Sequence, residues 1–489
     1  MTAEIKRFPG ETTERLTPRK QAQRAFADRM APERRRWIRR NAYYYEEDHR
    51  YLRFLVPPGR KVLVLGCGVG DLLAALEPAE GVGVDISLRA IDVARANYPQ
   101  FTFHAGDIED GVTIERLGGP FDVIVLPDAI GAMEDCEITL SLLHRLCTRE
   151  TRLVVAYYSK MWEPILTLAE RLGLKMPQLE LNWLSAADIE GLLRLADFDI
   201  VKHEWRILLP KRLLGLGRLV NRFAASLPVV RQFCLRIYVV ARPALGLELG
   251  TPSCSVVVPC RNERGNIRSL VERLPRFCPD QEIVFVEGHS SDGTWNAVGE
   301  VMAEARDVPI RRFRQDGRGK GDAVRKGFAE ARGEVLIILD ADLSVAPETI
   351  PKFYGALVAG KGNFINGTRL VYPREQNAMR LINLVGNRAF SILFTWLLNQ
   401  RFTDTLCGTK ALTRSHYLRI LADRAYFGEF DPFGDFDLIF GAVKQNLKVA
   451  EIPIRYAARS YGETQISRFR DGFLLIRMVV FAWRKLKAI

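Results

Sequence analysis

Short apolar runs of strand length, rich in β-branched residues, occur in two series along the chain, and each series alternates with segments of helical pattern. The first series begins at Lys61 (KVLVLG) and ends near Arg242, and the second begins at Ser255 (SVVVPC). Such alternation is typical of doubly wound α/β folds with mostly parallel sheets. A chain of 489 residues also exceeds what one hydrophobic core ordinarily serves. We therefore predict two α/β domains.

The stretch PALGLELGTP between the two series is rich in Pro and Gly, which predicts a linker. The last two runs of the first series suggest a closing antiparallel pair, and the basic, apolar insertion KRLLGLGRLVNRFAASLPVV lies between them. We expect this insertion to touch a membrane or the other domain. The predicted organisation is a basic tail and cap at 1–50, a first domain at 51–245, a linker at 246–252, a second domain at 253–470 and an amphipathic helix at 471–489.

The net charge of +12 favours anionic partners such as nucleotides, lipid phosphates, anionic membranes or nucleic acid. The eight Cys residues show no zinc-like spacing, so we expect reduced structural thiols. The sequence shows no signal peptide and no run of 18 apolar residues, which predicts an intracellular protein that does not span a bilayer. The apolar stretch from Phe473 to Trp483 is broken by Arg477, as in helices that lie on a membrane or on a core.

The segment KVLVLGCGVGDLL in the first domain predicts a strand, a glycine turn and a helix. Gly66, Gly68 and Gly70 would let a ligand approach the backbone at the start of the helix. Asp85 ends the next strand, where a carboxylate can bind ribose hydroxyls, and Asp107 follows the third strand, where it can meet an adenine amine. This order of turn, acid and acid resembles class I methyltransferases that use S-adenosylmethionine, over roughly residues 50–242.

The catalytic side of this first site is less defined. A third glycine of the dinucleotide fingerprint is missing, so an NAD domain is the weaker interpretation. After the fourth strand the chain has LPDAIGAMED instead of the Asn/Asp-Pro-Pro-Tyr motif of amino-group methylation, and Asp128 is a candidate pocket residue. The leading hypothesis is a methyltransferase of unassigned acceptor. The alternative is a domain that serves only as a binding or scaffold module.

Polar residues follow the strands of the second domain in the same way. Pro259 and Glu263 come after its first strand, and Glu287 and Asp292 after its second. Ligands of parallel sheets bind at this edge. The next segment, QDGRGKGDAVRKGF, interleaves glycines with Arg318 and Lys320, and its Gly321 opens a helix, which makes a suitable cradle for a diphosphate.

The run EVLIILDADLSV places Asp340 and Asp342 at the end of an apolar strand. Two carboxylates at this spacing repel one another unless a cation lies between them. A hard divalent ion, Mg²⁺ or Mn²⁺, that bridges to a diphosphate would remove the repulsion and stabilise a departing nucleoside diphosphate. The sequence therefore predicts metal-dependent chemistry on a nucleotide diphosphate.

This ordered set resembles family 2 glycosyltransferases with a GT-A fold, most closely their polyprenyl-phosphate branch, over about residues 253–470. The resemblance implies direct transfer with inversion from a UDP- or GDP-linked sugar. One departure is Gly288, which stands where a second acid is usual. By the resemblance, the nucleoside is held by Pro259, Glu263, Glu287 and Asp292, the diphosphate by Lys320, and the metal by Asp340 and Asp342.

Two acceptors remain open for this transferase. A polyprenyl phosphate is already anionic and needs basic residues, whereas a saccharide hydroxyl needs a base, for which Asp437 is the candidate. Apolar residues around Trp396, together with the C-terminal helix, would form a surface at the inner face of a membrane, which favours the lipid acceptor. A nucleic-acid-binding protein is disfavoured because it would leave the GRGKG and DAD motifs of the second domain unexplained. The candidate acceptor-binding residues are Arg369, Lys410, Arg459 and Arg468.

Overall fold

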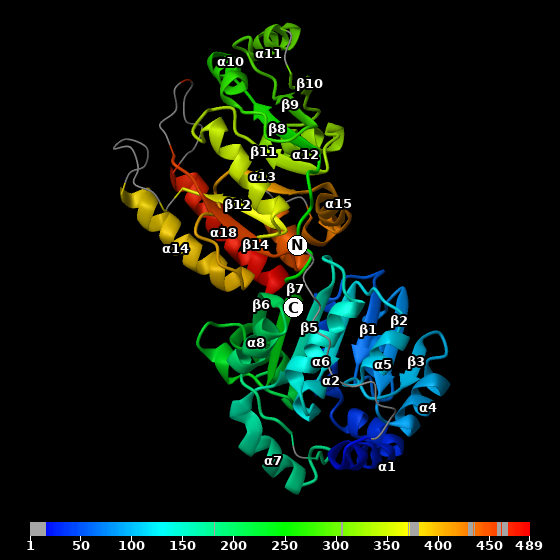
Figure 1. Cartoon of the computed structure of the whole chain (residues 1–489). Helices are drawn as coiled ribbons and strands as arrows, with labels where there is room; N and C mark the ends of the chain where they lie inside the picture. Colours follow the sequence, from blue (N-terminus) through cyan, green and yellow to red (C-terminus); the bar gives the residue numbers. More distant parts are fainter. Residues whose placement is uncertain are drawn as a thin grey trace.

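The computed structural model describes residues 16–179, 181–304, 307–369, 371, 381–428, 434, 436–456, 461 and 468–489, without the side chains of 381–387 and 468–472. Two seven-stranded sheets follow one another along the chain. Figure 1 shows the two units stacked end to end, with helices packed around each sheet. The predicted fold class, two α/β domains, is confirmed.

The N-terminal sheet has the strand order β3-β2-β1-β4-β5-β7-β6. Its β7 runs antiparallel to β5 and β6, which confirms the predicted closing pair. The strands are β1 (Lys61–Leu65), β2 (Glu80–Asp85), β3 (Thr102–Ala105), β4 (Val123–Pro127), β5 (Arg152–Tyr158), β6 (Phe198–Arg206) and β7 (Arg236–Pro243). The helices are α1 (Pro18–Arg40), α2 (Ala42–Leu55), α3 (Asp71–Leu76), α4 (Leu88–Asn97), α5 (Gly111–Arg116), α6 (Cys136–Leu142), α7 (Glu163–Arg171), α8 (Ala186–Leu195) and α9 (Leu216–Leu219).

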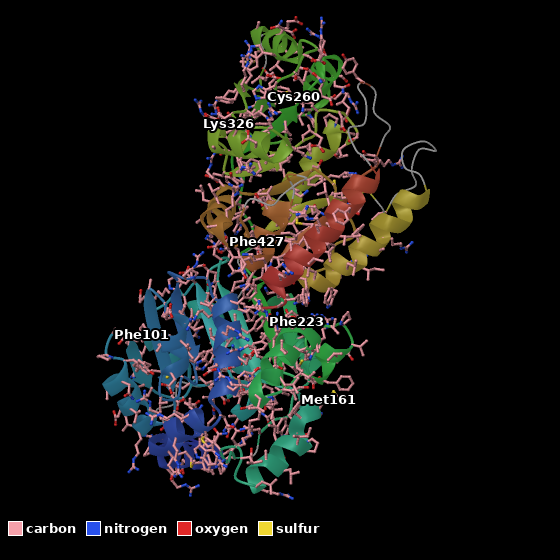
Figure 2. The ribbon with its side chains drawn as sticks, turned by 180° about the vertical axis from the view of Figure 1, so that it is seen from behind. Phe101, Met161, Phe223, Cys260, Lys326 and Phe427 are labelled. Atoms are coloured by element: carbon pink, nitrogen blue, oxygen red, sulfur yellow. The ribbon has the colours of Figure 1, made fainter. Side chains whose placement is uncertain are left out.

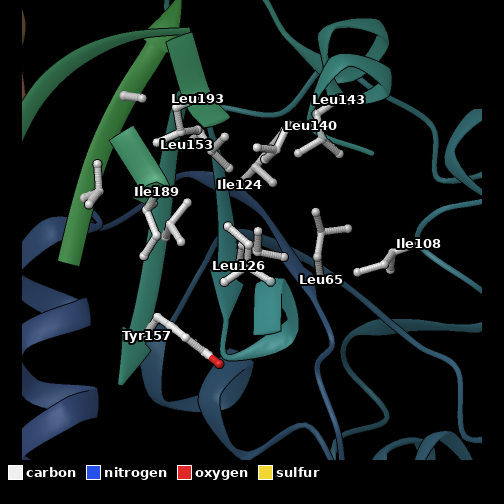
Figure 3. Close-up of a cluster of buried hydrophobic side chains, with 14 of the residues drawn as sticks. Leu65, Ile108, Ile124, Leu126, Leu140, Leu143, Leu153, Tyr157, Ile189 and Leu193 are labelled. Atoms are coloured by element: carbon white, nitrogen blue, oxygen red, sulfur yellow. The ribbon is translucent and has the colours of Figure 1, made fainter. Parts of the chain in front are cut away.

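Both faces of the N-terminal sheet are buried, which is why its strands read as continuous apolar runs. On one face Leu126 and Leu153 meet Ile189 and Leu193 of α8 (Figure 3). On the other face the strands pack against α2, whose Leu52 is fully buried. The helices α1 and α2 thus occupy most of the part that the sequence presents as a basic tail and cap.

The C-terminal sheet has the order β10-β9-β8-β11-β13-β12-β14, in which β13 is antiparallel to both neighbours. The chain passes from the end of β7 to the start of β8 over the segment predicted as a linker. The strands are β8 (Cys254–Cys260), β9 (Gln281–Glu287), β10 (Ile310–Arg314), β11 (Val335–Ile338), β12 (Phe364–Thr368), β13 (Lys410–Thr413) and β14 (Val449–Pro453). The helices are α10 (Arg264–Arg273), α11 (Thr294–Ala303), α12 (Lys320–Glu330), α13 (Ile350–Val358), α14 (Leu381–Leu398), α15 (Arg414–Ala422), α16 (Arg424–Phe427), α17 (Phe436–Lys444) and α18 (Arg468–Leu486).

Helices α14 and α18 are packed on their inner sides and bare on their outer sides. Phe394 of α14 and Met478 of α18 are fully buried in the core of the C-terminal domain. Ile392, Phe473 and Ile476 are exposed, by 68%, 62% and 55%. Within the described residues, no helix combines the length and hydrophobicity needed to span a bilayer.

The two domains meet through the amino ends of their sheets. Arg152, which begins β5, donates from Nε to the carbonyl of Asn446 at 2.7 Å and from Nη2 to Asn363 Oδ1 at 3.0 Å. Arg242 at the end of β7 reaches the same Asn363 oxygen at 3.2 Å and the carbonyl of Gly360 at 2.8 Å. Because these contacts use the amino ends of parallel strands, the carboxyl ends of both sheets face away from the interface.

A second buried cluster joins β6 to the C-terminal helix. Glu204 accepts from Lys487 Nζ at 2.7 Å and from the hydroxyl of Tyr51 at 3.1 Å. Arg206 donates to the carbonyl of Leu486 at 3.2 Å. Lys487 and Glu204 are 0% and 3% exposed. Breaking a buried pair of this kind costs about 3 to 5 kcal/mol, so the cluster holds the domains in one arrangement.

Lys202 in this cluster makes the interface sensitive to pH. Burial and the nearby Lys444 and Lys487 lower the pKa of Lys202 to about 7, although Glu204 acts against them. In the unfolded chain Lys202 would have a pKa of about 10.4, well above its folded value. The contribution of Lys202 to the free energy of unfolding is therefore least favourable below about pH 7 and becomes more favourable as the pH rises above it. From about pH 6 to about pH 8.5, we expect the free energy of unfolding of the wild type to rise by about 2 kcal/mol relative to Lys202→Met.

Urea denaturation of the full chain at the two pH values measures this difference. Lys352 is exposed on α13, so Lys352→Met should follow the wild type at both pH values. A constant difference between Lys202→Met and the wild type would contradict a buried, proton-releasing Lys202.

Candidate active sites

The glycine turn after β1 requires glycine for steric reasons. Gly66, Gly68 and Gly70 have φ angles of 77°, 53° and 86°, a region that side chains disfavour. A Cβ on Gly66 would come within 2.9 Å of the Cβ of Ala129. The turn therefore leaves the backbone open to a ligand at the carboxyl end of the sheet.

Three predicted acids gather around this turn. Asp85 ends β2 and accepts from the amides of Gly68 and Ser87 at 2.8 and 2.9 Å. Asp107 is paired with Lys20 of α1 at 3.0 Å. Asp128 follows β4 with a positive φ of 60° and is ion-paired with Arg236. Burial raises the pKa of both Asp85 and Asp128.

A cavity of about 400 Å³ brings these residues together. Gly66, Gly68, Asp85, Asp107 and Asp128 all line it, whereas Gly70 is not among its lining residues. Helices α1 and α7 contribute further walls, and Figure 1 shows both helices at the end of the N-terminal domain remote from the C-terminal domain. Five of the six residues predicted for S-adenosylmethionine thus share one cavity.

Arg34 of α1 is a cavity residue that the sequence does not single out. Its Nε lies 3.1 Å from the point where a Cβ on Gly68 would stand, and it forms no hydrogen bond or close ion pair with the described residues. Burial opposes the charge, but Tyr45, Asp85 and Asp128 outweigh it and raise the pKa of Arg34. In the sequence, Arg34 is one of several arginines in the stretch before Tyr43. The sequence pattern alone does not show which of these arginines lines the cavity and which face solvent.

In the second domain, hydrogen bonds fix the loops after β8 and β9 to one another. The amide of Glu263 donates to Thr294 Oγ1 at 2.9 Å, and the Glu263 carboxylate accepts from Asn266 at 2.6 Å. Asp292 accepts from the amides of Thr294 and Arg264 at 3.0 and 3.1 Å. Glu263 and Asp292 therefore lie in two adjoining loops at the carboxyl end of the sheet. The other two predicted nucleoside-binding residues, Pro259 and Glu287, lie at the ends of β8 and β9.

Gly288, which stands where the family resemblance implies a second acid, packs against Gln315. Gly288 is buried, and a Cβ there would stand 3.0 Å from Oε1 of Gln315. Gln315 is 6% exposed, and its Nε2 donates to the carbonyl of Gly317 at 2.9 Å. Gln315 thus lies against Gly288 and links this position to the glycine-rich loop.

The glycine-rich loop delivers a lysine to the paired acids. Gly319 has a φ of 86° and caps α12, whose first residue is Lys320. Lys320 Nζ lies 2.7 Å from Asp340 Oδ1. Burial alone would raise the pKa of Asp340, but Lys320, with Lys410 and Arg369, holds it below its usual range.

Asp342 completes the acidic pair at the end of β11. Its Oδ1 accepts from the amide and hydroxyl of Ser344 at 3.0 and 2.6 Å. Asp340 and Asp342 supply oxygen donors of the kind that Mg²⁺ and Mn²⁺ prefer, so the residues present fit a divalent ion. The helix start at Lys320 adds a positive end for a diphosphate beside them.

Gly408 is a further residue that sequence reasoning missed. A Cβ on Gly408 would come within 2.0 Å of Asp340 Oδ2 and 2.2 Å of Lys320 Nζ. Lys410, two residues on, is fully buried and donates from Nζ to the carbonyl of Cys407. Lys410 therefore lowers the pKa of Asp340 from a buried position, and its side chain is not exposed to an acceptor.

The remaining predicted residues are the candidates for binding the acceptor and for the base. Arg369 holds Asp404 with two bonds of 2.6 and 2.9 Å, and its side chain is 12% exposed. Asp437 opens α17 and accepts from Arg424 Nε at 3.2 Å. Arg459 and the side chain of Arg468 lie outside the described residues.

Two family models match the chain. Residues 255–425 match the model of "Glycosyl transferase family 2". Residues 35–203 match a model described as "Methyltransferase domain". The two matches fall on the two sheets, one on each.

Two curated relatives each cover somewhat less than half of this chain. A dolichol-phosphate mannosyltransferase of Mycosarcoma maydis is 31% identical over 47% of this chain and 86% of its own length. A polyprenol monophosphomannose synthase of Mycolicibacterium smegmatis is 29% identical over 43% of this chain and 80% of its own length. A Thermotoga maritima protein described as a SAM-dependent methyltransferase covers 45% of this chain, with 99% of its own length covered, 16% identity and a TM-score of 0.34.

The contact at Gly408 generates a prediction. Gly408→Ala would force the Lys320–Asp340 pair apart, because the new Cβ would overlap both side chains. We expect the affinity for UDP or GDP with Mn²⁺ to fall by at least about tenfold, which is about 1.4 kcal/mol. Calorimetric titration of the full chain measures this.

Gly355→Ala is the matched control, since a Cβ there has nothing within 4 Å and the residue lies in α13. Wild-type affinity in Gly408→Ala would show that the pair lies outside the nucleotide site.

Proposed function

The chain belongs to glycosyl transferase family 2 and carries a methyltransferase domain before it, and from this premise we propose that its second domain transfers a sugar from a nucleotide diphosphate to a polyprenyl phosphate. The observation that carries the proposal is the Lys320–Asp340 pair at the start of α12, beside Asp342. A lysine, a helix start and two neighbouring carboxylates support the binding of a donor diphosphate with a divalent ion.

Asp340 and Asp342 would hold a divalent ion, which would supply charge neutralisation of the leaving nucleoside diphosphate. The chain's own part is to bind and orient. Lys320 and the amides at the start of α12 would bind the diphosphate, and the loops around Glu263 and Asp292 would hold the nucleoside. Attack by the acceptor phosphate oxygen on the anomeric carbon would then give inversion without an enzyme nucleophile.

The acceptor assignment rests on the outer sides of α14 and α18. Their exposed Ile392, Phe473, Ile476 and Val480 lie among basic residues such as Arg477, a pattern of helices that rest on anionic membranes. We place the protein peripherally at the cytoplasmic face of a membrane, where a polyprenyl phosphate is available. Asp437 supports the phosphate acceptor as well, because Arg424 and Arg325 already engage its carboxylate.

The donor test uses UDP- and GDP-sugars with Mn²⁺ or Mg²⁺ and a short polyprenyl phosphate. We expect lipid-linked product from the wild type and a loss of at least about 100-fold in Asp342→Asn, because electrostatic stabilisation of the leaving group is lost. Asp316→Asn is the control, since the Asp316 side chain is 86% exposed near the same loop. Donor turnover that does not require the lipid would refute the polyprenyl assignment.

Asp437→Asn separates the two acceptors in the same assay. With a phosphate acceptor no strong base is needed, so this variant should retain most activity. Loss of activity, together with transfer to a soluble saccharide by the wild type, would assign the hydroxyl acceptor instead.

For the first domain we propose binding of S-adenosylmethionine in the 400 Å³ cavity. Asp85 would hold the ribose, and Asp107 would meet the adenine end. Arg34, charged and without a close partner among the described residues, would bind the carboxylate of the methionine end. The bound cosubstrate would supply an activated methyl group, and the domain would orient it toward Asp128.

Arg34→Gln tests this assignment. Charge-assisted hydrogen bonds contribute about 1.5 to 3 kcal/mol, so the affinity for S-adenosylmethionine should fall about 10- to 100-fold. Calorimetry on the full chain measures the affinity, with Arg36→Gln, exposed on the same helix, as the control. Equal affinity in the two variants would remove Arg34 from the site, and binding without methyl transfer to any acceptor would favour the scaffold alternative.

A further inference from the structure

The insertion between β6 and β7 presents an apolar and basic surface. Over residues 205–235 the chain has no Asp or Glu, and Lys211, Arg212, Arg218 and Arg222 are exposed. Leu214 is fully exposed, and seven further large apolar side chains of the insertion are at least 43% exposed. Contiguous exposed apolar patches mark sites of interaction. Six of these eight residues are called here the insertion face: Leu213, Leu214, Leu216, Leu219, Phe223 and Val229.

The insertion face continues the bare outer sides of α14 and α18. Trp396 of α14 and Trp483 of α18 donate from their indole nitrogens to Ser226, at 3.0 and 3.1 Å. The rings of Phe223 and Trp483 are 5.6 Å apart. Figure 2 shows Phe223 and Met161 on the same side of the molecule as α14 and α18, and Figure 1 shows α7 and α14 on one side as well. The insertion of the first domain therefore adjoins α14 and α18 of the second domain.

The insertion also reaches the cavity of the N-terminal domain. Pro210, Lys211 and Leu235, at the two ends of the insertion, line the cavity. Leu174 and Leu179 line it too and remain 45% and 38% exposed, so the cavity opens between them and solvent. The mouth of the cavity thus combines apolar side chains with Lys175 and Lys211, and it lies beside the insertion.

The cavity itself has two unlike parts. Asp85 and Arg34 lie at the glycine turn, whereas Lys175 and Lys211 line the cavity near its mouth. The rest is walled by Met30, Trp37 and Met176 together with the leucines at the mouth. The indole nitrogen of Trp37 is buried without a hydrogen-bond partner among the described residues. An apolar wall of this extent has no counterpart in a cosubstrate made of a nucleoside and an amino acid.

We propose that the methyl acceptor is an amphipathic lipid that enters this cavity from an anionic bilayer resting on the insertion face. Its chain would lie along Leu174 and Leu179, and its polar head would lie toward Asp128 and Trp37. The basic residues of the insertion complement anionic head groups, each contributing about 1 kcal/mol near the surface. The proposal rests on the membrane contact proposed above for α14 and α18.

Photocrosslinking tests the acceptor site without requiring a bilayer. The probe is a diazirine-bearing polyprenyl phosphate presented in detergent micelles to the full chain, and the labelled peptides are mapped by mass spectrometry. We expect labelling over residues 172–181 that falls at least about tenfold in Leu179→Asp, because a carboxylate there would lose hydration against the apolar chain of the probe. Leu195→Asp is the control, since Leu195 is 66% exposed on α8 and is not a cavity residue.

A second measurement separates this inference from the membrane contact. Co-sedimentation with phosphatidylglycerol vesicles should weaken in Leu213→Ser/Leu214→Ser and in Phe473→Ser/Ile476→Ser. Absence of labelling over 172–181 in the wild type would overturn the acceptor site alone, since the micelles deliver the probe. Absence of vesicle binding would overturn the membrane contact alone. Wild-type labelling in Leu179→Asp would likewise overturn the proposed path of the chain.

Discussion

The arrangement of the molecule depends on buried charges between its two domains. Arg152, Arg242, Glu204 and Lys487 are each at most 5% exposed, and all of them bond across the interface. Removing one partner from such a contact leaves the other polar or charged group buried without compensation, so these bonds favour one arrangement of the domains. That geometry sets the sheets back to back by their amino ends. Both carboxyl ends, where α/β sheets bind ligands, are consequently left open at opposite ends of the molecule.

The opposed sites limit how the two domains can cooperate. Among the described residues, the interface contacts lie at the amino ends of both sheets, whereas the cavity at Asp128 and the paired acids at Asp340 lie at the carboxyl ends. The apolar surface formed by α14, α18 and the insertion includes residues of both domains. Cooperation would therefore run along a membrane and not through the protein, with each domain acting on molecules held in the same plane.

The sequence predicts the two sheets well because β-branched runs and turn glycines encode them locally. It also predicts the grouping of Asp85, Asp107 and Asp128 in one cavity, since strand ends of a parallel sheet converge. It could not separate Arg34 from its neighbours, because the side of α1 that meets the glycine turn depends on tertiary packing. Gly408 was missed for a similar reason, as its contact with Asp340 joins strands β11 and β13, which are distant in sequence. Roles of individual site residues remain predictions.

The pair of Glu204 and Lys487 joins residues 283 positions apart in the chain. A ribosome that adds about 5 to 20 residues per second needs roughly 15 to 60 seconds to cover that distance. During this interval the N-terminal domain can fold while Glu204 and Arg206 still face solvent or a chaperone. The interface thus forms only late in synthesis. Until then the nascent first domain must remain soluble with its docking surface exposed.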